Sequence, residues 1–172
     1  MIQVKDVVKS FDGNVVLNHV SANFEDGKVN MIIGQSGSGK TVLMKSMIGL
    51  HQIDGGEIIF DTSDGQQNLA GMTEKEVRML HREVGMLFQG AALFDSMTVQ
   101  ENVMYPLEMF SDMSRDEMVA RARFCLERVN MPERAFGLMP SEISGGMQKR
   151  VAIARAIALN PKYLFCDEPN SG

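Results

Sequence analysis

The sequence has little of what a secreted, membrane-spanning or nucleic-acid-binding protein requires. Its two cysteines, Cys125 and Cys166, form no C-x-x-C pair or Cys/His cluster, which argues against a disulfide framework and favours two reduced, buried thiols. No apolar run approaches the roughly 20 residues that span a bilayer, and the N-terminus lacks the basic and apolar segments of a secretory signal. We therefore expect any membrane span to come from a different polypeptide.

Basic residues are also fewer than acidic residues. The chain has 17 Lys and Arg against 22 Asp and Glu, for a formal net charge of −5. Because nucleic acids and anionic membranes attract basic surfaces, we expect neither as a primary partner. The 172 residues are 44% apolar and 23% charged, which is the balance of an ordinary globular domain.

Strand and helix patterns alternate along the chain. Strands are expected at 2–8 and 14–20, which the turn Asp12-Gly13-Asn14 joins, and at 28–33, 57–60, 84–88 and 163–166. Helices are expected at 40–50, 73–82, 99–109, 115–129 and 145–159, with a polar loop at 61–72 and a proline-containing connection at 130–143. The alternation predicts an α/β fold with a largely parallel sheet. We predict one domain, with a core lobe of about 1–90 and 160–172 and an inserted helical subdomain of about 98–159.

A glycine-rich segment follows the strand expected at 28–33. Its residues, which fit G-x-x-x-x-G-K-[ST], are Gly34, Gln35, Ser36, Gly37, Ser38, Gly39, Lys40 and Thr41. Glycines let backbone N–H groups surround a polyphosphate beside a helix N-terminus, Lys40 would contact the β- and γ-phosphates, and the Thr41 hydroxyl would bind Mg²⁺. A glycine turn that matches by chance is the alternative, and the flanking strand and helix disfavour it. The segment predicts that the chain binds ATP and Mg²⁺.

Two carboxylates end the last expected strand. Asp167 and Glu168 follow four apolar residues, and open α/β sheets bind ligands at the carboxyl ends of their strands. Asp167 is the candidate Mg²⁺ ligand, and Glu168 is the candidate general base that orients the attacking water. The alternative is a pair of solvated acids at the start of a loop.

The segment Ile143-Ser-Gly-Gly-Met-Gln-Lys-Arg150, before a long alanine-rich helix, resembles the signature motif of the ATP-binding-cassette (ABC) ATPases. The order of glycine loop, signature and acidic strand is typical of that family. The resemblance covers essentially the whole chain. It implies a P-loop NTPase fold with a RecA-like parallel sheet, a small N-terminal antiparallel β part and an inserted helical subdomain.

The resemblance also implies roles for further residues. Gln89 matches a glutamine that contacts Mg²⁺ and senses the transmembrane partner, although without the family it reads as a polar residue that ends a strand. Phe11 matches an aromatic residue that stacks on adenine, or it is a core residue of the first hairpin. Ser144, Gly145 and Gly146 match residues that close over the γ-phosphate of a second ATPase subunit, in a head-to-tail dimer.

A narrower resemblance concerns the cargo. The segments 85–103, 105–107, 138–147 and 167–172 are similar to the lipid-trafficking ABC ATPases of the Mla (MCE-associated) type, including Met147 where most ABC proteins have glutamine. This implies a peripheral subunit on the cytoplasmic side of the inner membrane that powers phospholipid transport. A permease would dock near residues 90–110, whose apolar side chains we expect to be partly core and partly exposed.

The resemblance also implies more chain than the sequence provides. The family continues past residue 172 with a histidine and with a strand that lies between the glycine-loop strand and the acidic strand. We therefore expect residues 1–172 to be incomplete, to be unstable by themselves, and to have uncertain activity alone. Two other functions stay open: a soluble ABC ATPase of DNA repair or translation, and a fragment that binds nucleotide without hydrolysing it.

Overall fold

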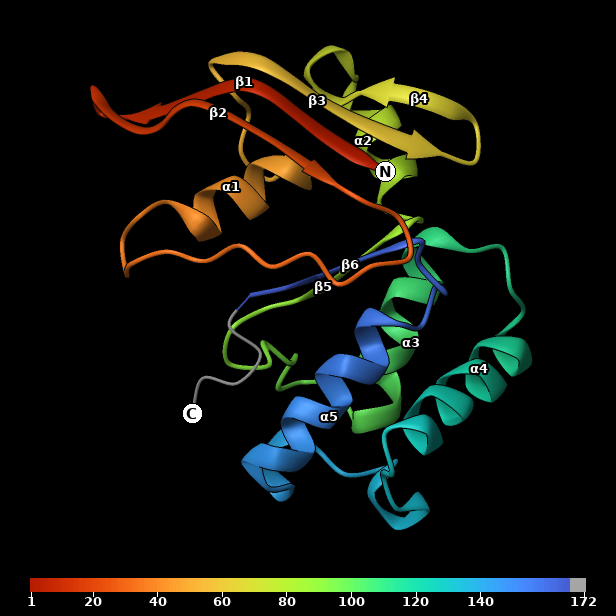
Figure 1. Cartoon of the computed structure of the whole chain (residues 1–172). Helices are drawn as coiled ribbons and strands as arrows, with labels where there is room; N and C mark the ends of the chain where they lie inside the picture. The colour runs from red at the N-terminus through yellow and green to blue at the C-terminus, as the bar shows by residue number, and fades with distance from the viewer. Residues whose placement is uncertain (168–172) are drawn as a thin grey trace. The chain divides into compact units, whose positions relative to one another are not determined.

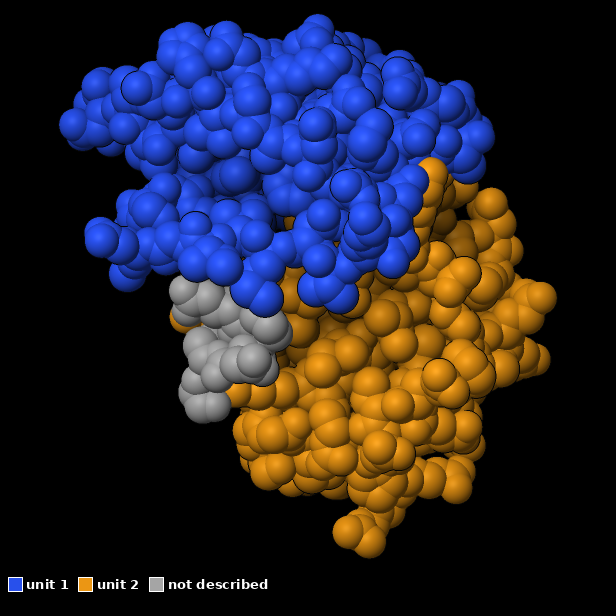
Figure 2. Space-filling model, in the orientation of Figure 1, with its two compact units in different colours: residues 1–80 blue, residues 81–172 orange. Residues whose placement is uncertain are grey.

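The computed structural model describes residues 1–167 of the chain. The chain divides into two compact units, residues 1–80 and residues 81–172 (Figure 2). The division into a core lobe and an inserted helical subdomain stays a prediction. Within residues 1–167, no helix combines the length and the hydropathy needed to cross a membrane.

An antiparallel sheet of four strands dominates unit 1 (Figure 1). Its order is β2-β1-β3-β4, with β1 at Ile2–Phe11, β2 at Asn14–Phe24, β3 at Gly55–Thr62 and β4 at Gly65–Asn68. Asp12 and Gly13 have φ of 49° and 81°, the left-handed values that a two-residue hairpin turn requires. The apolar side of the sheet is buried because alternate residues face it, as in the cross-strand pairs Ile2–Phe60 and Val4–Ile58.

Two helices complete unit 1. Helix α1, at Lys40–Met47, buries Leu43, Met44 and Met47, and helix α2 spans Glu74–Leu80. The predicted cap of α2 is formed, since the Thr73 N–H donates to Glu76 Oε2 at 2.7 Å and the Glu76 N–H donates to Thr73 Oγ at 3.4 Å.

Two sequence predictions in unit 1 are wrong. Residues 28–33 form no strand, and Val29, Met31 and Ile33 are 94%, 75% and 84% exposed, because no strand within residues 1–167 pairs with this segment. Residues 61–72 are not one loop, since β4 and a 3₁₀ turn at Leu69–Gly71 lie within them. Here the backbone of β3 supplies a hydrogen-bonding edge that polar residues can pair with as well as apolar ones.

In the described part of unit 2, residues 81–167, a pair of parallel strands is combined with three α-helices (Figure 1). Strand β5, Val84–Leu87, pairs in parallel with β6, Tyr163–Cys166. The helices are α3 at Val99–Phe110, α4 at Arg115–Arg128 and α5 at Gly145–Ala156, and two 3₁₀ turns, η2 at Glu133–Ala135 and η3 at Pro140–Glu142, lie between α4 and α5. Each predicted helix of this region is present, with ends that differ by at most a few residues.

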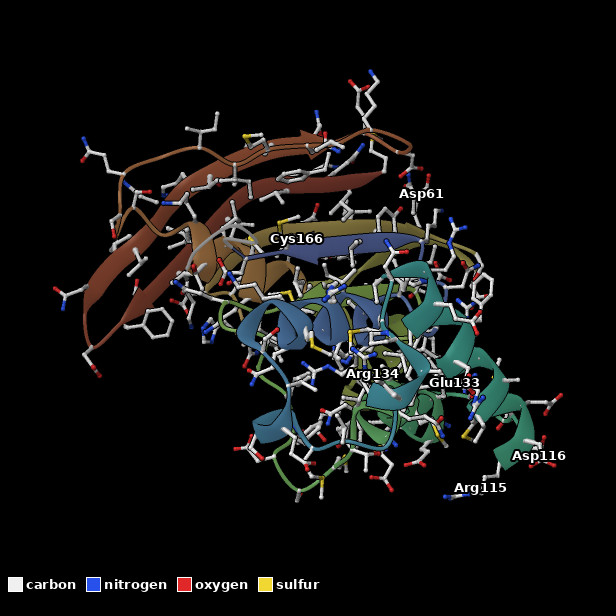
Figure 3. All side chains as sticks on the ribbon, turned by 90° about the horizontal axis from the view of Figure 1, so that it is seen from below. Asp61, Arg115, Asp116, Glu133, Arg134 and Cys166 are labelled. Atoms are coloured by element: carbon white, nitrogen blue, oxygen red, sulfur yellow. The ribbon has the colours of Figure 1, made fainter. Side chains whose placement is uncertain are left out.

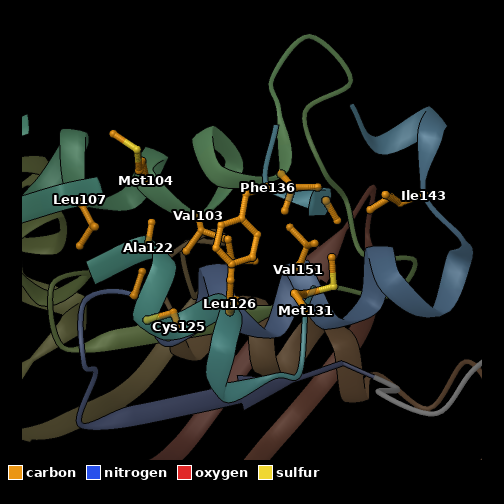
Figure 4. Packing of buried hydrophobic residues seen from close by; sticks show 14 residues of the cluster. Val103, Met104, Leu107, Ala122, Cys125, Leu126, Met131, Phe136, Ile143 and Val151 are labelled. Carbon is orange, nitrogen blue, oxygen red and sulfur yellow. The ribbon is translucent and has the colours of Figure 1, made fainter. Parts of the chain in front are cut away.

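The three helices of unit 2 enclose an apolar core (Figure 4). Phe136 lies among side chains of all three helices, including Val103, Leu126 and Val151. Helix α5 meets strand β5 at Gly85, where a Cβ atom would lie 2.9 Å from Pro161 Cγ, 3.0 Å from Leu164 Cδ1 and closer still to the Ala156 carbonyl oxygen. Only glycine allows the helix end to pack this closely on the strand.

The two cysteines differ, against the prediction that both are buried. Both are free, but Cys125 is fully buried in the helical core whereas Cys166 is exposed. Cys166 alternates with Phe165 along β6, so that it points to the face of the strand that the described residues leave uncovered. Burial raises the pKa of the Cys125 thiol, which makes it a weak nucleophile.

Candidate functional site

The glycine-rich segment 34–41 forms a closed loop that leads into α1. Lys40 Nζ donates hydrogen bonds to the carbonyl oxygens of Gly34 at 3.0 Å and Gln35 at 2.9 Å, and the Ser38 N–H donates to Gln35 at 3.2 Å. Gly37 and Gly39 have φ of 78° and 90°, a region that favours glycine. The loop therefore closes on itself through the side chain of Lys40. An ammonium group has three N–H donors, and the loop carbonyls accept two of them.

The N-terminus of α1 suits an anion. Its N-cap residue is Gly39, so that no side chain caps the first N–H groups of the helix, and its first turn contains no acidic residue. The first turns of α2, α3 and α4 do contain acids: Glu74 and Glu76, Glu101, and Asp116 and Glu117, of which Figure 3 labels Asp116. Hydrogen bonds from the capping threonine or serine lower the pKa of Glu76, Glu101 and Glu117, which keeps these carboxylates charged. Of the α-helices in residues 1–167, only α1 and α5 have first turns without an acid.

Phe11 lies at the end of β1, and it is exposed rather than part of the core. Its ring meets the ring of His51 edge-on, with centroids 5.3 Å apart, and Lys9 Nζ lies 5.2 Å from its centroid. Asp54, which the sequence reasoning did not single out, accepts hydrogen bonds from Lys9 Nζ at 2.9 Å and from the Ser10 N–H at 2.6 Å. The hydrogen bond from Lys9 is the main reason that the pKa of Asp54 is lowered. Stacking of Phe11 on adenine stays a prediction.

The parallel pairing of unit 2 brings Gln89 and Asp167 to one edge. Leu87 pairs with Cys166 at the ends of β5 and β6, and the Asp167 N–H donates to the Leu87 carbonyl oxygen at 2.9 Å. Gln89 follows two residues later and is exposed, whereas Asp167 is 7% exposed. The candidate base Glu168 lies outside the described residues.

The segment Ser144-Gly145-Gly146 begins helix α5. The Ser144 hydroxyl accepts a hydrogen bond from the Met147 N–H at 3.3 Å, which leaves its own O–H as a donor. All three residues are exposed, and a Cβ atom at either glycine would meet nothing within 4 Å. A helix N-terminus that is exposed, glycine-rich and free of acids suits contact with an anion from outside the chain.

The proposed Mg²⁺ ligands belong to different units. Thr41 is part of unit 1, whereas Gln89 and Asp167 are part of unit 2. Residues 1–167 contain no group of three or more His, Cys, Asp or Glu side chains placed to hold a metal. A hydroxyl, an amide and one carboxylate are oxygen donors of the kind that Mg²⁺ accepts when phosphate oxygens and water complete its shell. The shared Mg²⁺ site therefore stays a prediction.

Residues 17–171 match the ABC transporter family. The chain belongs to this family. A solved dimer of the ATP-binding cassette MJ0796, in a post-hydrolysis state bound to ADP and Pi, superposes on this ABC chain with a TM-score of 0.89. That match has 32% sequence identity and covers 99% of this chain and 75% of that one, which confirms the predicted fold class.

Two curated relatives are similar to the ABC chain over nearly all of its length. It is 39% identical over 171 residues to the methionine import ATP-binding protein MetN of Clostridium acetobutylicum, which is 99% of this chain and 52% of that protein. It is also 39% identical over 171 residues to the glutamine transport ATP-binding protein GlnQ of Escherichia coli, or 69% of that protein. The chain thus spans about half the length of MetN and 69% of GlnQ. Neither relative is named for lipid transport. These matches therefore support membership of the ABC family but do not single out the Mla type.

Proposed function

We propose that the protein to which this chain belongs is the ATP-hydrolysing subunit of a membrane ABC transporter. The proposal rests on the glycine loop 34–41 and on the N-terminus of α1 that follows it. At this N-terminus no side chain caps the first N–H groups, and the first turn contains no acidic residue. Such a loop offers backbone N–H groups and a positive dipole end to a polyphosphate. Family membership and the fit to a cassette solved with ADP and Pi support the same ligand.

The residues of the site have separate roles in binding, metal coordination and proton transfer. ATP would supply the phosphoanhydride bond, and the positive charge of Mg²⁺ would offset the negative charge of the phosphate oxygens. Lys40 would direct its remaining N–H donor to the phosphates, while the loop carbonyls hold its side chain in place. Thr41, Gln89 and Asp167 would provide oxygen ligands to the metal. Glu168 would orient the attacking water and take up its proton.

A second copy of the chain would complete each site. Ser144, Gly145 and Gly146 are exposed at the N-terminus of α5 and would contact the γ-phosphate held by the partner's glycine loop. The hydroxyl and the helix dipole act most strongly on an anion when the interface excludes water. ATP would therefore hold two copies together head to tail, and hydrolysis would release them.

We also propose that a permease docks on segment 90–110 and that the protein sits at the cytoplasmic side of the inner membrane. In this segment Phe94 and Met109 are each 40% exposed, while Val99 and Met104 are buried, so part of the apolar surface is available to a partner. The cargo that we propose is phospholipid, on the strength of the resemblance to the Mla type.

The cargo is tested with the transporter itself. The protein is purified with the membrane partner that it binds, and its ATPase activity is measured with phospholipid, methionine or glutamine added. Stimulation by phospholipid alone is expected. Stimulation by one of the amino acids would contradict the lipid assignment, and recovery without any integral membrane partner would contradict a role in transport.

Replacement of Glu168 by glutamine tests the catalytic assignment. The Glu168→Gln protein is expected to bind ATP normally, to lose at least about 100-fold in turnover, and to accumulate as an ATP-bound dimer, because glutamine keeps the shape but not the basicity. Phosphate release and size-exclusion chromatography with and without ATP measure these effects. Normal hydrolysis by this variant would remove Glu168 as the base.

A further inference from the structure

The segment that follows Gln89 has an unusual backbone. Gly90, Ala91 and Ala92 are three consecutive residues with positive φ, of 78°, 66° and 48°. Left-handed conformations are unfavourable for alanine, because its Cβ atom approaches the backbone carbonyl oxygen. Within the segment, the Ala92 N–H donates to the Gly90 carbonyl oxygen at 2.8 Å. The surrounding structure must therefore hold this conformation in place.

Arg155, in the last turn of α5, supplies the contact. Its Nη1 donates to the Ala92 carbonyl oxygen at 2.8 Å, and its Nη2 donates to the Ala91 carbonyl oxygen at 2.9 Å. The guanidinium also lies 5.7 Å from the ring centroid of Phe94. Two parallel hydrogen bonds from one planar group fix both the distance and the orientation of the segment, which a lysine could not do.

Asn102 of α3 holds the other end of the same loop. Its side chain is fully buried and accepts a hydrogen bond from the Phe94 N–H at 2.8 Å, and its two amide N–H groups are shared among the carbonyl oxygens of Phe94, Met97 and Thr98, which lie 3.0–3.1 Å from Nδ2. Loop 90–98 is thus fixed at Ala91 and Ala92 by one helix and at Phe94 and Met97 by another. Phe88 and Gln89 join this fixed loop to β5, whose last residue, Leu87, accepts a hydrogen bond from the Asp167 N–H.

We propose that Arg155 is a positioning residue, which fixes the position of Gln89 by holding loop 90–94. Through helix α5, Arg155 also connects Gln89 to Ser144, Gly145 and Gly146 at the N-terminus of that helix. The inference rests on the proposed function, since it takes Gln89 as part of the ATP site. Arg155 and Gly145 belong to one continuous helix and are about 15 Å apart along its axis. A shift of α5 when Ser144 and its neighbours contact phosphate would therefore move the anchor of the Gln89 loop.

Hydrogen–deuterium exchange tests the contact without reference to activity. In the intact protein, Arg155→Met is expected to speed exchange of the amides in 88–98 by about tenfold while the rest of the chain is unchanged. The matched control is Arg150→Met, since Arg150 lies on the same helix but donates to the Asn130 carbonyl oxygen instead. Unchanged exchange in 88–98, or an equal effect of the control, would overturn the proposal.

Kinetics test the link to Gln89. Arg155→Met is expected to lower kcat for ATP hydrolysis by about tenfold with little change in KM. Arg155→Lys is expected to have a kcat between those of the unaltered protein and Arg155→Met. The lysine variant also replaces the methionine variant in this test if Arg155→Met fails to fold. A loss in KM alone, or full activity despite faster exchange, would overturn the positioning role. If the unaltered protein does not hydrolyse ATP, the proposed function is overturned, and the exchange experiment alone decides whether Arg155 holds the loop.

A double-mutant cycle isolates the role of backbone strain. Replacing both Ala91 and Ala92 with glycine removes the steric cost of positive φ, so the loop should depend less on Arg155. We expect Arg155→Met to reduce kcat by less than about threefold in that background. An equal loss in both backgrounds would show that Arg155 does not act by holding the left-handed segment.

Discussion

Replacement of Lys40 by alanine is expected to abolish ATP turnover and to weaken nucleotide binding severely. The side chain has two roles, because it closes the glycine loop through hydrogen bonds to the carbonyls of Gly34 and Gln35 and adds a positive charge to that loop. Loss of one preorganised donor at a charged transition state commonly costs about 100- to 1,000-fold in kcat. Isothermal titration with a slowly hydrolysed ATP analogue and measurement of phosphate release separate binding from turnover.

Lys45 provides the matched control for this variant. It lies in the last turn of the same helix, away from the loop, so Lys45→Ala removes an equal charge without opening the loop. Near-normal ATP binding and hydrolysis are expected. If Lys40→Ala and Lys45→Ala behave alike, or if Lys40→Ala keeps its activity, the glycine loop is not the phosphate site.

Replacement of Gly85 by alanine is expected to produce a large loss of stability. The new methyl group would overlap the carbonyl oxygen at the end of α5 and press on Pro161 and Leu164. The nearest atom belongs to the backbone, so the clash can be relieved only by moving the helix away from β5. Overpacking of this kind costs about 1–3 kcal/mol, a large share of a typical stability of about 5–15 kcal/mol. The free energy of unfolding from urea titration measures it.

Gly137 is the control position in the same unit. A Cβ atom there would meet nothing within 4 Å, and its φ is not positive, so Gly137→Ala is expected to leave the urea midpoint almost unchanged. An equally small effect at Gly85 would mean that α5 does not pack on β5 as described.

Features that depend on neighbouring residues were predictable from the sequence. The capping boxes that begin α3 and α4 are formed by residues three apart, Thr98 with Glu101 and Ser114 with Glu117, and both are present. The glycine loop and the helix that follows it also form, as does the short strand that ends before Asp167. The ligands assigned to these residues stay predictions.

Features that depend on distant partners were not predictable in the same way. Residues 28–33 have the composition of a strand, but a strand needs an edge to pair with, and composition does not show whether one is present. Cys166 has the residue type of a buried thiol, but its exposure depends on what covers β6. The same limit applies to Asp54, whose position just before strand β3 gave no sign that it accepts hydrogen bonds from Lys9 and Ser10.

The sequence by itself determined the order of the motifs, the residues at which the helices begin, to within one position, and the family, because these depend on residue types at short and regular spacings. Only the tertiary structure revealed that Arg155 holds Ala91 and Ala92, residues 64 and 63 positions away, in a left-handed turn beside Gln89. The sequence around Arg155 does not indicate which groups its guanidinium binds, because every residue has the same backbone carbonyl group. The folded chain selects which of them the guanidinium can reach.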